Sequence, residues 1–378
     1  MKNADVKTLL EVTSLPVAAG REEAVVKYVA DWTAEHRGRI ILRRDGCGNL
    51  ILSRPDFARA AKKRAPLFVT AHLDHPAFVL RSVSRGTVEL EFRGGVQDPY
   101  FKGAAIELFA PGLERAFAAR IVSLDAKAKP FKLAKARLVR ASDGAHLTPG
   151  CIGRWKFPAS SVKGGLVYTN GCDDTACVAA ALLAFDRISR SARNAHVALL
   201  LTRAEEIGFI GAIGAARAGS VPKNSRLLCL ECSRSFPHDS PVGAGPIVRV
   251  GDRMSVFTPE LTNLVSKVAE EHKARRPGFK YQRKLMPGGV CEASAFSIYG
   301  YASTCVCLPL GNYHNMADVD AVLAGKKKAG VGQEYISVDD FRGLIELIGA
   351  VAGNLDSPRK SGRAAMEERW AKLGGLLS

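Results

Sequence analysis

The stretch NGCDDTACVAAALLAF (residues 170–185) places two adjacent aspartates directly before an alanine-rich apolar run. The run predicts a helix over residues 174–190, and a helix N-terminus attracts one negatively charged side chain. A second carboxylate beside the first adds repulsion without adding a capping role. Asp173 and Asp174 therefore indicate a positively charged partner at this point of the fold.

Alternating helices and strands surround this helix on both sides in the sequence. Downstream, apolar runs at 195–204, 225–233 and 303–310 predict strands, and helices are expected from about residue 208, over 258–274 and over 338–353. Upstream, two helical segments precede a strand–turn–strand at 39–54. Residues 65–80 form one apolar run that predicts a single buried, parallel strand. The alternation is typical of an α/β protein with a mixed central sheet and helices on both faces.

Residues 77–163 follow a different pattern. Short runs such as TVELEF (87–92) and FKLAKARLVR (131–140) alternate polar and apolar side chains, and turn residues separate them. Alternation with period two at short intervals predicts a small β-barrel or sandwich. The sequence thus predicts one α/β domain formed by residues 1–76 and 164–378, with an inserted β-rich domain at 77–163.

The composition excludes some classes of protein. No apolar run reaches the roughly 18 residues of a membrane span, and the first residues lack the apolar core of a signal peptide, which predicts a cytoplasmic protein. The 378 residues include 54 lysines and arginines against 37 acids, a net charge of +17. The basic residues are spread along the chain without a nucleic-acid motif, so solvated basic faces are the favoured interpretation over a nucleic-acid partner.

The nine cysteines are odd in number and scattered, as expected for reduced thiols. Cys229 and Cys232 form a CxxC pair, but no second pair lies at the spacing of a zinc ribbon. These cysteines therefore do not by themselves predict a metal site.

Ionisable side chains gather where the predicted central strands end. In an open α/β sheet the carboxyl ends of the strands form the ligand-binding edge. Each residue alone has an ordinary structural explanation, but together these carboxylates and imidazoles would repel one another in a buried site, and divalent cations relieve that repulsion. The residues are His72, Asp74, Asp173, Asp174, Glu205, Glu206, Glu231 and His314.

The spacing of these residues predicts hydrolytic chemistry. Residues i and i+2 of a strand share a face, so Asp74 can hold the second ring nitrogen of His72. Glu205 and Glu206 are adjacent and diverge, so that one can bind a metal while the other accepts a proton from water. Mixed histidine and carboxylate ligands suit zinc, with cobalt or manganese as alternatives.

With these motifs the sequence resembles the tetrahedral-assembly (TET-type) dizinc aminopeptidases, also called glutamyl or deblocking aminopeptidases, of the co-catalytic zinc exopeptidases. The similarity covers nearly the whole chain. It includes DGCGNLI (45–51), AHLD (71–74), CDDTACVAAAL (172–182), EEIGFIGA (205–212) and YHN (313–315). The family also carries a β-rich insert between the His-x-Asp and Asp-Asp motifs, so the resemblance implies that residues 1–76 and 164–378 are the metallopeptidase catalytic domain.

The resemblance also implies roles for individual residues. Asp173 would bridge two divalent metal ions, with zinc as the first choice and a cis peptide bond after this residue. Glu205 would act as general base and acid, and Asp74 would be the second catalytic residue. The family often forms homo-oligomers, including dodecamers. The remaining metal ligands would be Glu206 and His314 at one ion and His72 and Glu231 at the other.

Departures from the family pattern leave the substrate open. His75 has no counterpart, Thr175 replaces an arginine, and Glu231 stands where aminopeptidases commonly carry aspartate and related carboxypeptidases carry glutamate. The leading hypothesis is an aminopeptidase acting on short peptides. A carboxypeptidase or an N-acyl amino acid deacylase with the same metal chemistry is the alternative, and a non-catalytic basic binding protein on a peptidase fold is the second.

Overall fold

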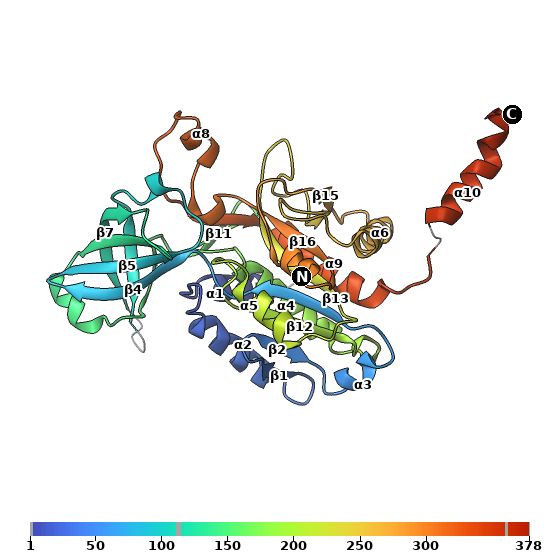
Figure 1. Cartoon of the computed structure of the whole chain (residues 1–378), viewed down its shortest axis with the longest axis horizontal. Helices are drawn as coiled ribbons and strands as arrows, with labels where there is room; N and C mark the ends of the chain where they lie inside the picture. The colour runs from blue at the N-terminus through green and yellow to red at the C-terminus, as the bar shows by residue number, and fades with distance from the viewer. Residues whose placement is uncertain (1–2, 111–114, 360–361, 378) are drawn as a thin grey trace.

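The centre of the molecule is a mixed eight-stranded sheet (Figure 1). The computed structural model describes residues 3–110, 115–359 and 362–377. The strands β3, β12, β13 and β16 run parallel in the middle, while β2 and β14 join them antiparallel. From edge to edge the strands are β1 (Ile41–Arg44), β2 (Leu50–Ser53), β12 (Val197–Thr202), β3 (Leu67–His72), β13 (Arg226–Arg234), β16 (Ala302–Leu310), β14 (Ile247–Arg249) and β15 (Gln282–Lys284).

Helices cover both faces of this sheet, which confirms the predicted fold class. One face packs against α1 (Asn3–Thr13), α2 (Glu23–Glu35), α4 (Thr175–Ile188), α6 (Pro259–Arg275) and α9 (Val338–Asn354). The other face packs against α3 (Phe57–Ala61), α5 (Ile210–Ala218) and α7 (Glu292–Ile298). The parallel strands are buried on both faces, which explains their continuous apolar sequences.

Helix α4 is the central helix of the larger layer. It contacts α1, α9 and the strands β3, β12 and β13, and eleven of its fourteen residues are buried. Its alanines allow this close approach because they carry no bulk beyond Cβ. Asp174 occupies the N-cap position, but its side chain makes no capping hydrogen bond. Asp174 therefore does not stabilise the helix as a capping side chain, and the motif needs another explanation for this residue.

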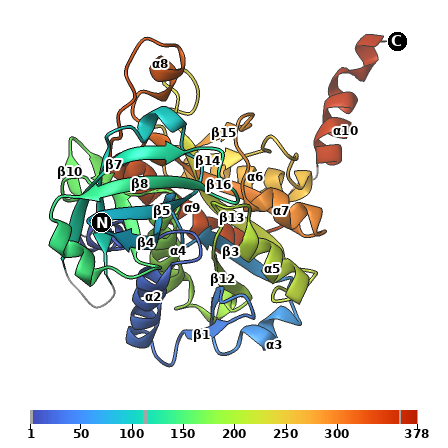
Figure 2. The same ribbon diagram turned by 60° about the vertical axis from the view of Figure 1, so that its left-hand side comes forward.

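The inserted segment forms a closed six-stranded barrel, as expected of a small β unit, and Figure 2 shows it turned toward the viewer. Phe78, Phe92, Phe101 and Trp155 pack edge to face in its interior. Such aromatic packing adds to the free energy gained by burial. Around the barrel the strands are β4 (Ala77–Ser84), β5 (Thr87–Arg93), β8 (Lys132–Leu138), β7 (Ala116–Asp125), β6 (Ala105–Phe109) and β9 (Ile152–Trp155).

Two details differ from the sequence prediction. The apolar run at 65–80 is not one strand: β3 ends at His72, and β4 begins at Ala77 in the barrel. Pro76 lacks a backbone N–H, so a central strand cannot continue through it. In addition, β10 (Ser161–Lys163) pairs with β11 (Leu166–Thr169) and not with the barrel. The domain boundaries themselves stay a prediction.

A short sheet and the chain end complete the fold. The strand β17 (Glu334–Ser337) pairs with β11 beside the sheet edge that carries the candidate site. The helix α8 (Val319–Leu323) stands above the molecule, and α10 (Gly362–Leu373) projects away from its body (Figure 1). Among the residues that the structure describes, no helix combines the length and the apolar character needed to cross a bilayer.

Candidate metal centre

The structure brings the predicted ligands together at the carboxyl ends of the central strands. His72 ends β3, Glu231 lies on β13, and Glu205 and Glu206 follow β12. Asp173 lies just before α4, and His314 belongs to a 3-10 turn after β16. Five elements thus contribute to one buried site, as the strand ends of a parallel sheet allow.

Asp173 lies between two groups of ligands. Its Oδ1 is 3.4 Å from Nε2 of His72, and its Oδ2 is 3.4 Å from Nε2 of His314. Oε1 of Glu231 is 3.5 Å from the same His72 nitrogen, and Oε1 of Glu206 is 3.5 Å from the same His314 nitrogen. The donor atoms therefore form two groups that share the Asp173 carboxylate.

Asp74 connects His72 with the adjacent glutamates. Its Oδ1 lies 3.4 Å from Nδ1 of His72, so it faces the ring nitrogen opposite the ligand side. Its two oxygens also accept the N–H groups of Glu205 and Glu206, each at 3.0 Å. Oε2 of Glu205 is 3.9 Å from Nε2 of His72, so this carboxylate borders the site. Asp74 thus fixes both the histidine and the turn that carries the two glutamates.

The electrostatics of the site favour bound cations. Burial raises the pKa values of the Glu205 and Glu231 carboxyls well above their usual range. Burial also raises the pKa of the Glu206 carboxyl, to about 7. Burial works against ionisation of His314, but Glu206 and Asp173 raise the pKa of this imidazole to about 9. Oδ1 of Asp173 and Oε1 of Glu206 are buried without a hydrogen-bond partner among the described residues. Divalent cations would supply the missing partners, so the donor set fits metal ions.

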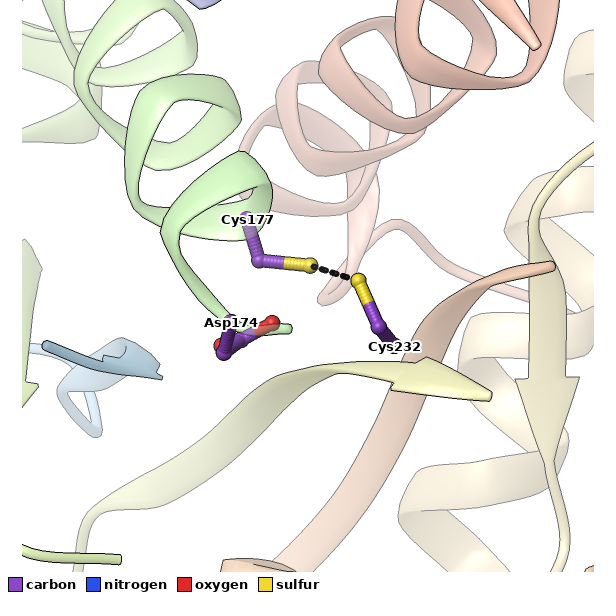
Figure 3. A group of neighbouring side chains, drawn as sticks. All are labelled: Asp174, Cys177 and Cys232. Atoms are coloured by element: carbon purple, nitrogen blue, oxygen red, sulfur yellow. Dashed lines mark hydrogen bonds between the residues drawn. The ribbon is translucent and has the colours of Figure 1, made fainter. Parts of the chain in front are cut away.

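Asp174, the second aspartate of the motif, supports the site through the backbone of His72. Its Oδ2 accepts the backbone N–H of His72 at 3.2 Å, and the peptide bond between Asp173 and Asp174 is cis. Figure 3 shows Asp174 at the start of α4 beside the thiols of Cys177 and Cys232, whose sulfur atoms are 4.0 Å apart. Asp174 therefore positions a ligand-bearing strand end.

The two thiols beside Asp174 act as small hydrogen-bond donors. Burial raises the pKa of both, so they stay protonated. Cys177 donates to the carbonyl of Glu231 and Cys232 to that of Cys172. Cys229, the other member of the CxxC pair, packs on the opposite face of the sheet. The CxxC pair is thus not one site.

Sequence reasoning missed Glu334, which is fully buried in β17. Its Oε2 accepts the backbone N–H groups of Cys172 and Asp173 at 2.5 and 3.1 Å, and its Oε1 accepts that of His314 at 2.7 Å. The Glu334 carboxylate therefore holds the main chain of Asp173, which both ligand groups share, and of His314, which belongs to one group. The only sequence signal was an acid within a short apolar run, and nothing in the pattern paired that run with the residues before α4.

His75 is a second support that sequence reasoning left without a role. Its Nδ1 lies 2.5 Å from the carbonyl oxygen of Asp173, and its Nε2 lies 3.0 Å from Oδ1 of Asn315. The ring also packs against Gly171, where a Cβ atom would come within 2.7 Å of it. His75 thus holds the backbone of the shared ligand through the carbonyl of Asp173 and requires glycine at position 171.

The candidate site opens into a pocket of about 390 Å³. The predicted ligands form one wall, and apolar side chains such as Phe236, Met286 and Leu323 form another. Cations also line it, among them Arg234, Arg249 and Lys284. A concave apolar pocket with a few charged groups is the usual form of a small-ligand site.

Comparison with solved structures shows a shared fold. The Pyrococcus horikoshii TET1 peptidase, described as assembling into a tetrahedron or a large octahedral shell, aligns with a TM-score of 0.72 at 19% identity, over 93% of this chain and 99% of its own. The aminopeptidase APDkam598 of the archaeon Desulfurococcus kamchatkensis aligns with a TM-score of 0.72 at 16% identity, over 95% and 98%. PhTET1-12s, described as a dodecamer, aligns with a TM-score of 0.71 at 20% identity, over 94% and 100%.

Comparison of sequences identifies the family to which the chain belongs. No curated protein sequence matches the chain. A family model described as M42 glutamyl aminopeptidase matches residues 48–327, a span that includes the barrel and every predicted ligand. The chain therefore belongs to the M42 glutamyl aminopeptidase family, a family of peptidases.

Proposed function

We propose that the protein is a metal-dependent aminopeptidase that releases N-terminal residues from short peptides. The observation that carries this proposal is the pair of ligand groups that share Asp173, with a separate carboxylate, Glu205, beside them. Two ligand groups around a bridging carboxylate fit two divalent ions, and the unligated glutamate is the group that hydrolysis requires.

The chain's own residues would hold two cations, zinc being the first choice. His72 and Glu231 would bind one, Glu206 and His314 the other, and Asp173 both. Bound there, the ions would lower the pKa of a water molecule and polarise the carbonyl of the scissile peptide bond. Asp74 would keep the His72 ring oriented through its Nδ1.

Glu205 would move the proton. It is buried beside the ligands, and the hydrogen bond from its N–H to Asp74 fixes its main chain. From this position its carboxylate would accept a proton from the attacking water and deliver it to the leaving amine.

Assembly into a homo-oligomer forms part of the proposal. Relatives of the same fold are described as a dodecamer and as a tetrahedron or octahedral shell. The alignments cover nearly all of this chain, so the fold that these relatives assemble from is present here.

The test is mass spectrometry of a mixed peptide digest, run with and without a chelator. Peptides shortened from the N-terminus, only without chelator, support a metallo-aminopeptidase. Glu205→Gln should keep its metal and lose turnover, while Glu270→Gln, at an exposed ion pair with Lys267, should behave as wild type. Substantial activity of Glu205→Gln would contradict the role of the base.

A second candidate keeps the metal chemistry and changes the substrate. Glu231 is the ligand that favours it, because related carboxypeptidases more often carry glutamate at this position. Peptides shortened from the C-terminus would establish a carboxypeptidase, and hydrolysis of N-acyl amino acids without peptide cleavage would establish a deacylase. Bound metal without any hydrolysis would favour a non-catalytic binding protein.

A further inference from the structure

The turn at 203–206 follows β12 and carries the proposed base, Glu205. Its four backbone N–H groups are all accepted by side chains from other parts of the chain. Asp74 accepts the last two of these groups. The first two, those of Arg203 and Ala204, are bound by side chains outside the set of predicted ligands. The residues that bind these two groups are therefore candidates for positioning the base.

Glu22 binds the N–H group that comes directly before the base. Its Oε1 accepts the N–H of Ala204 at 3.0 Å and that of Gly20 at 2.7 Å. Its Oε2 accepts the Nε–H of Arg203 at 2.7 Å. The side chain of Glu22 is 0% exposed, and the ion pair with Arg203 compensates its buried charge. Both carboxylate oxygens thus bind the start of the turn.

The place of Glu22 in the sequence predicts a different role. It is the N-cap residue of α2, where a side chain commonly accepts N–H groups of its own helix. The side chain of Glu22 accepts no hydrogen bond from the described residues of α2. The next residue, Glu23, is exposed and pairs with Arg21. The two adjacent glutamates therefore differ: Glu23 faces solvent, whereas Glu22 contacts Ala204, 182 positions away in the sequence.

Ala204 has a backbone conformation that its side chain disfavours. Its φ is +54°, in the left-handed region that glycine adopts freely and alanine does not. Such a conformation persists only where the surrounding structure holds it. The hydrogen bond from the N–H of Ala204 to Glu22 is a contact of this kind. Because Ala204 directly precedes Glu205, a change of its φ to negative values would redirect the carboxylate that follows.

The other side of the turn is fixed independently of Glu22. Oδ1 of Asn49 accepts the N–H of Arg203 at 3.0 Å, and its Nδ2 donates to the carbonyl of Gly211 at 2.9 Å. Gly211 in turn donates its N–H to the carbonyl of Arg203 at 2.8 Å. These bonds tie the end of β12 to α5. Replacing Glu22 should therefore release Ala204 without unfolding the turn.

We propose that Glu22 is a positioning residue that holds Ala204 in the left-handed conformation and thereby places the Glu205 carboxylate for proton transfer. The proposal rests on the aminopeptidase function proposed above. Glu22 is not one of the described residues that line the pocket. Its loss should therefore lower kcat, which depends on the base, and leave KM nearly unchanged.

The test compares Glu22→Met with the wild-type protein at saturating zinc, on the peptide that the wild type cleaves fastest. Methionine matches glutamate in length but has no oxygen to accept these hydrogen bonds. We expect kcat to fall by about 10- to 100-fold, as when a reacting group moves by about 1 Å, and KM to stay within about 3-fold. Elemental analysis should find the wild-type metal content, because Asp74 still holds the N–H of Glu206.

A second substitution separates positioning from general damage. Glycine at position 204 adopts a positive φ without the hydrogen bond, so adding Ala204→Gly to Glu22→Met should raise kcat by about 3- to 10-fold. Damage to the fold alone would not be repaired by a more flexible residue. Glu22→Gln keeps one acceptor oxygen and should retain more of kcat than Glu22→Met. Glu23→Gln, at the exposed ion pair with Arg21, is the matched control and should have wild-type kcat.

The outcomes separate this inference from the proposed function. Wild-type kcat in Glu22→Met, or a loss that Ala204→Gly does not repair, overturns the inference and leaves the aminopeptidase function intact. Loss of metal together with activity would mean that Glu22 supports Glu206 instead, and it also overturns the inference. If Glu22→Met does not fold, Glu22→Gln decides with a smaller loss of about 3-fold, and wild-type kcat there overturns the inference. A wild-type protein that releases no N-terminal residue overturns the proposed function and the inference together.

Discussion

Replacing Glu334 by glutamine should weaken metal binding although Glu334 is not a predicted ligand. Its two oxygens accept three backbone N–H groups, those of Cys172, Asp173 and His314. Glutamine keeps one carbonyl oxygen, which can serve Cys172 and Asp173, but its NH2 group would then face the N–H of His314. Glu334→Gln thus replaces one carboxylate oxygen by an NH2 group and thereby disturbs the backbone of two predicted ligands, Asp173 and His314.

The magnitude follows from these hydrogen bonds. Bonds to a charged acceptor contribute about 1.5–3 kcal/mol each, and a buried N–H left without an acceptor costs about 1–3 kcal/mol. Loss of one bond and weakening of two should lower the free energy of unfolding of the metal-free protein by about 2–4 kcal/mol. Because supports of this kind orient the ligands, metal affinity should fall by about 10- to 100-fold.

Two assays check this prediction. Urea denaturation of the chelator-treated protein gives the change in the free energy of unfolding, and competition with a chromophoric chelator gives the zinc affinity. Glu270→Gln, at an exposed ion pair, is the matched control and should stay within about 0.5 kcal/mol of wild type. Wild-type zinc affinity in Glu334→Gln would refute the argument, even if stability fell, because the carboxylate would then support the fold alone.

Three further predictions concern the shared ligand, a buried histidine and the barrel. Asp173→Ala should lose both metal ions and activity, and two ions per chain by elemental analysis would disprove its bridging position. Burial, followed by the charge of Arg64, lowers the pKa of His196 to about 4, so the stability it contributes is complete above pH 6.5 and declines as the pH falls toward 4. Between pH 7 and pH 4.5 the free energy of unfolding should fall by on the order of 2 kcal/mol more in the wild-type protein than in His196→Gln, which denaturation at the two pH values would detect. Phe92→Ala, 1% exposed in the barrel core, should cost about 3–5 kcal/mol, and a change under about 1 kcal/mol would show that the barrel repacks.

The sequence predicts the central strands well because burial on both faces leaves a strong pattern. The runs at 195–204 and 225–233 coincide with β12 and β13, whereas the run at 65–80 contains β3 but continues past its end at His72 into the barrel. In a parallel sheet the carboxyl ends of the strands lie at one edge. For these reasons the sequence alone predicts the candidate ligands at one edge of the sheet.

The supports could not be predicted in the same way because each depends on a tertiary contact. Glu334 acts on Asp173 across more than 150 residues, and the short β17 that carries it leaves a weak pattern. His75 likewise contacts the carbonyl of Asp173 although the two residues are 98 positions apart in the sequence. A single sequence contains the residue types of such contacts but not their distances.

The residues in which this chain departs from the family motifs divide by the direction they face. His75 contacts the carbonyl of Asp173, and Thr175 donates to the carbonyl of Gly171, so both act on the main chain around the shared ligand. Because these changes act on the backbone and not on the ligand atoms, we expect them to leave the proposed metal chemistry intact. Glu231 is the departure that lines the pocket, where it is a predicted metal ligand. Substrate choice in this chain should therefore depend more on Glu231 than on His75 or Thr175.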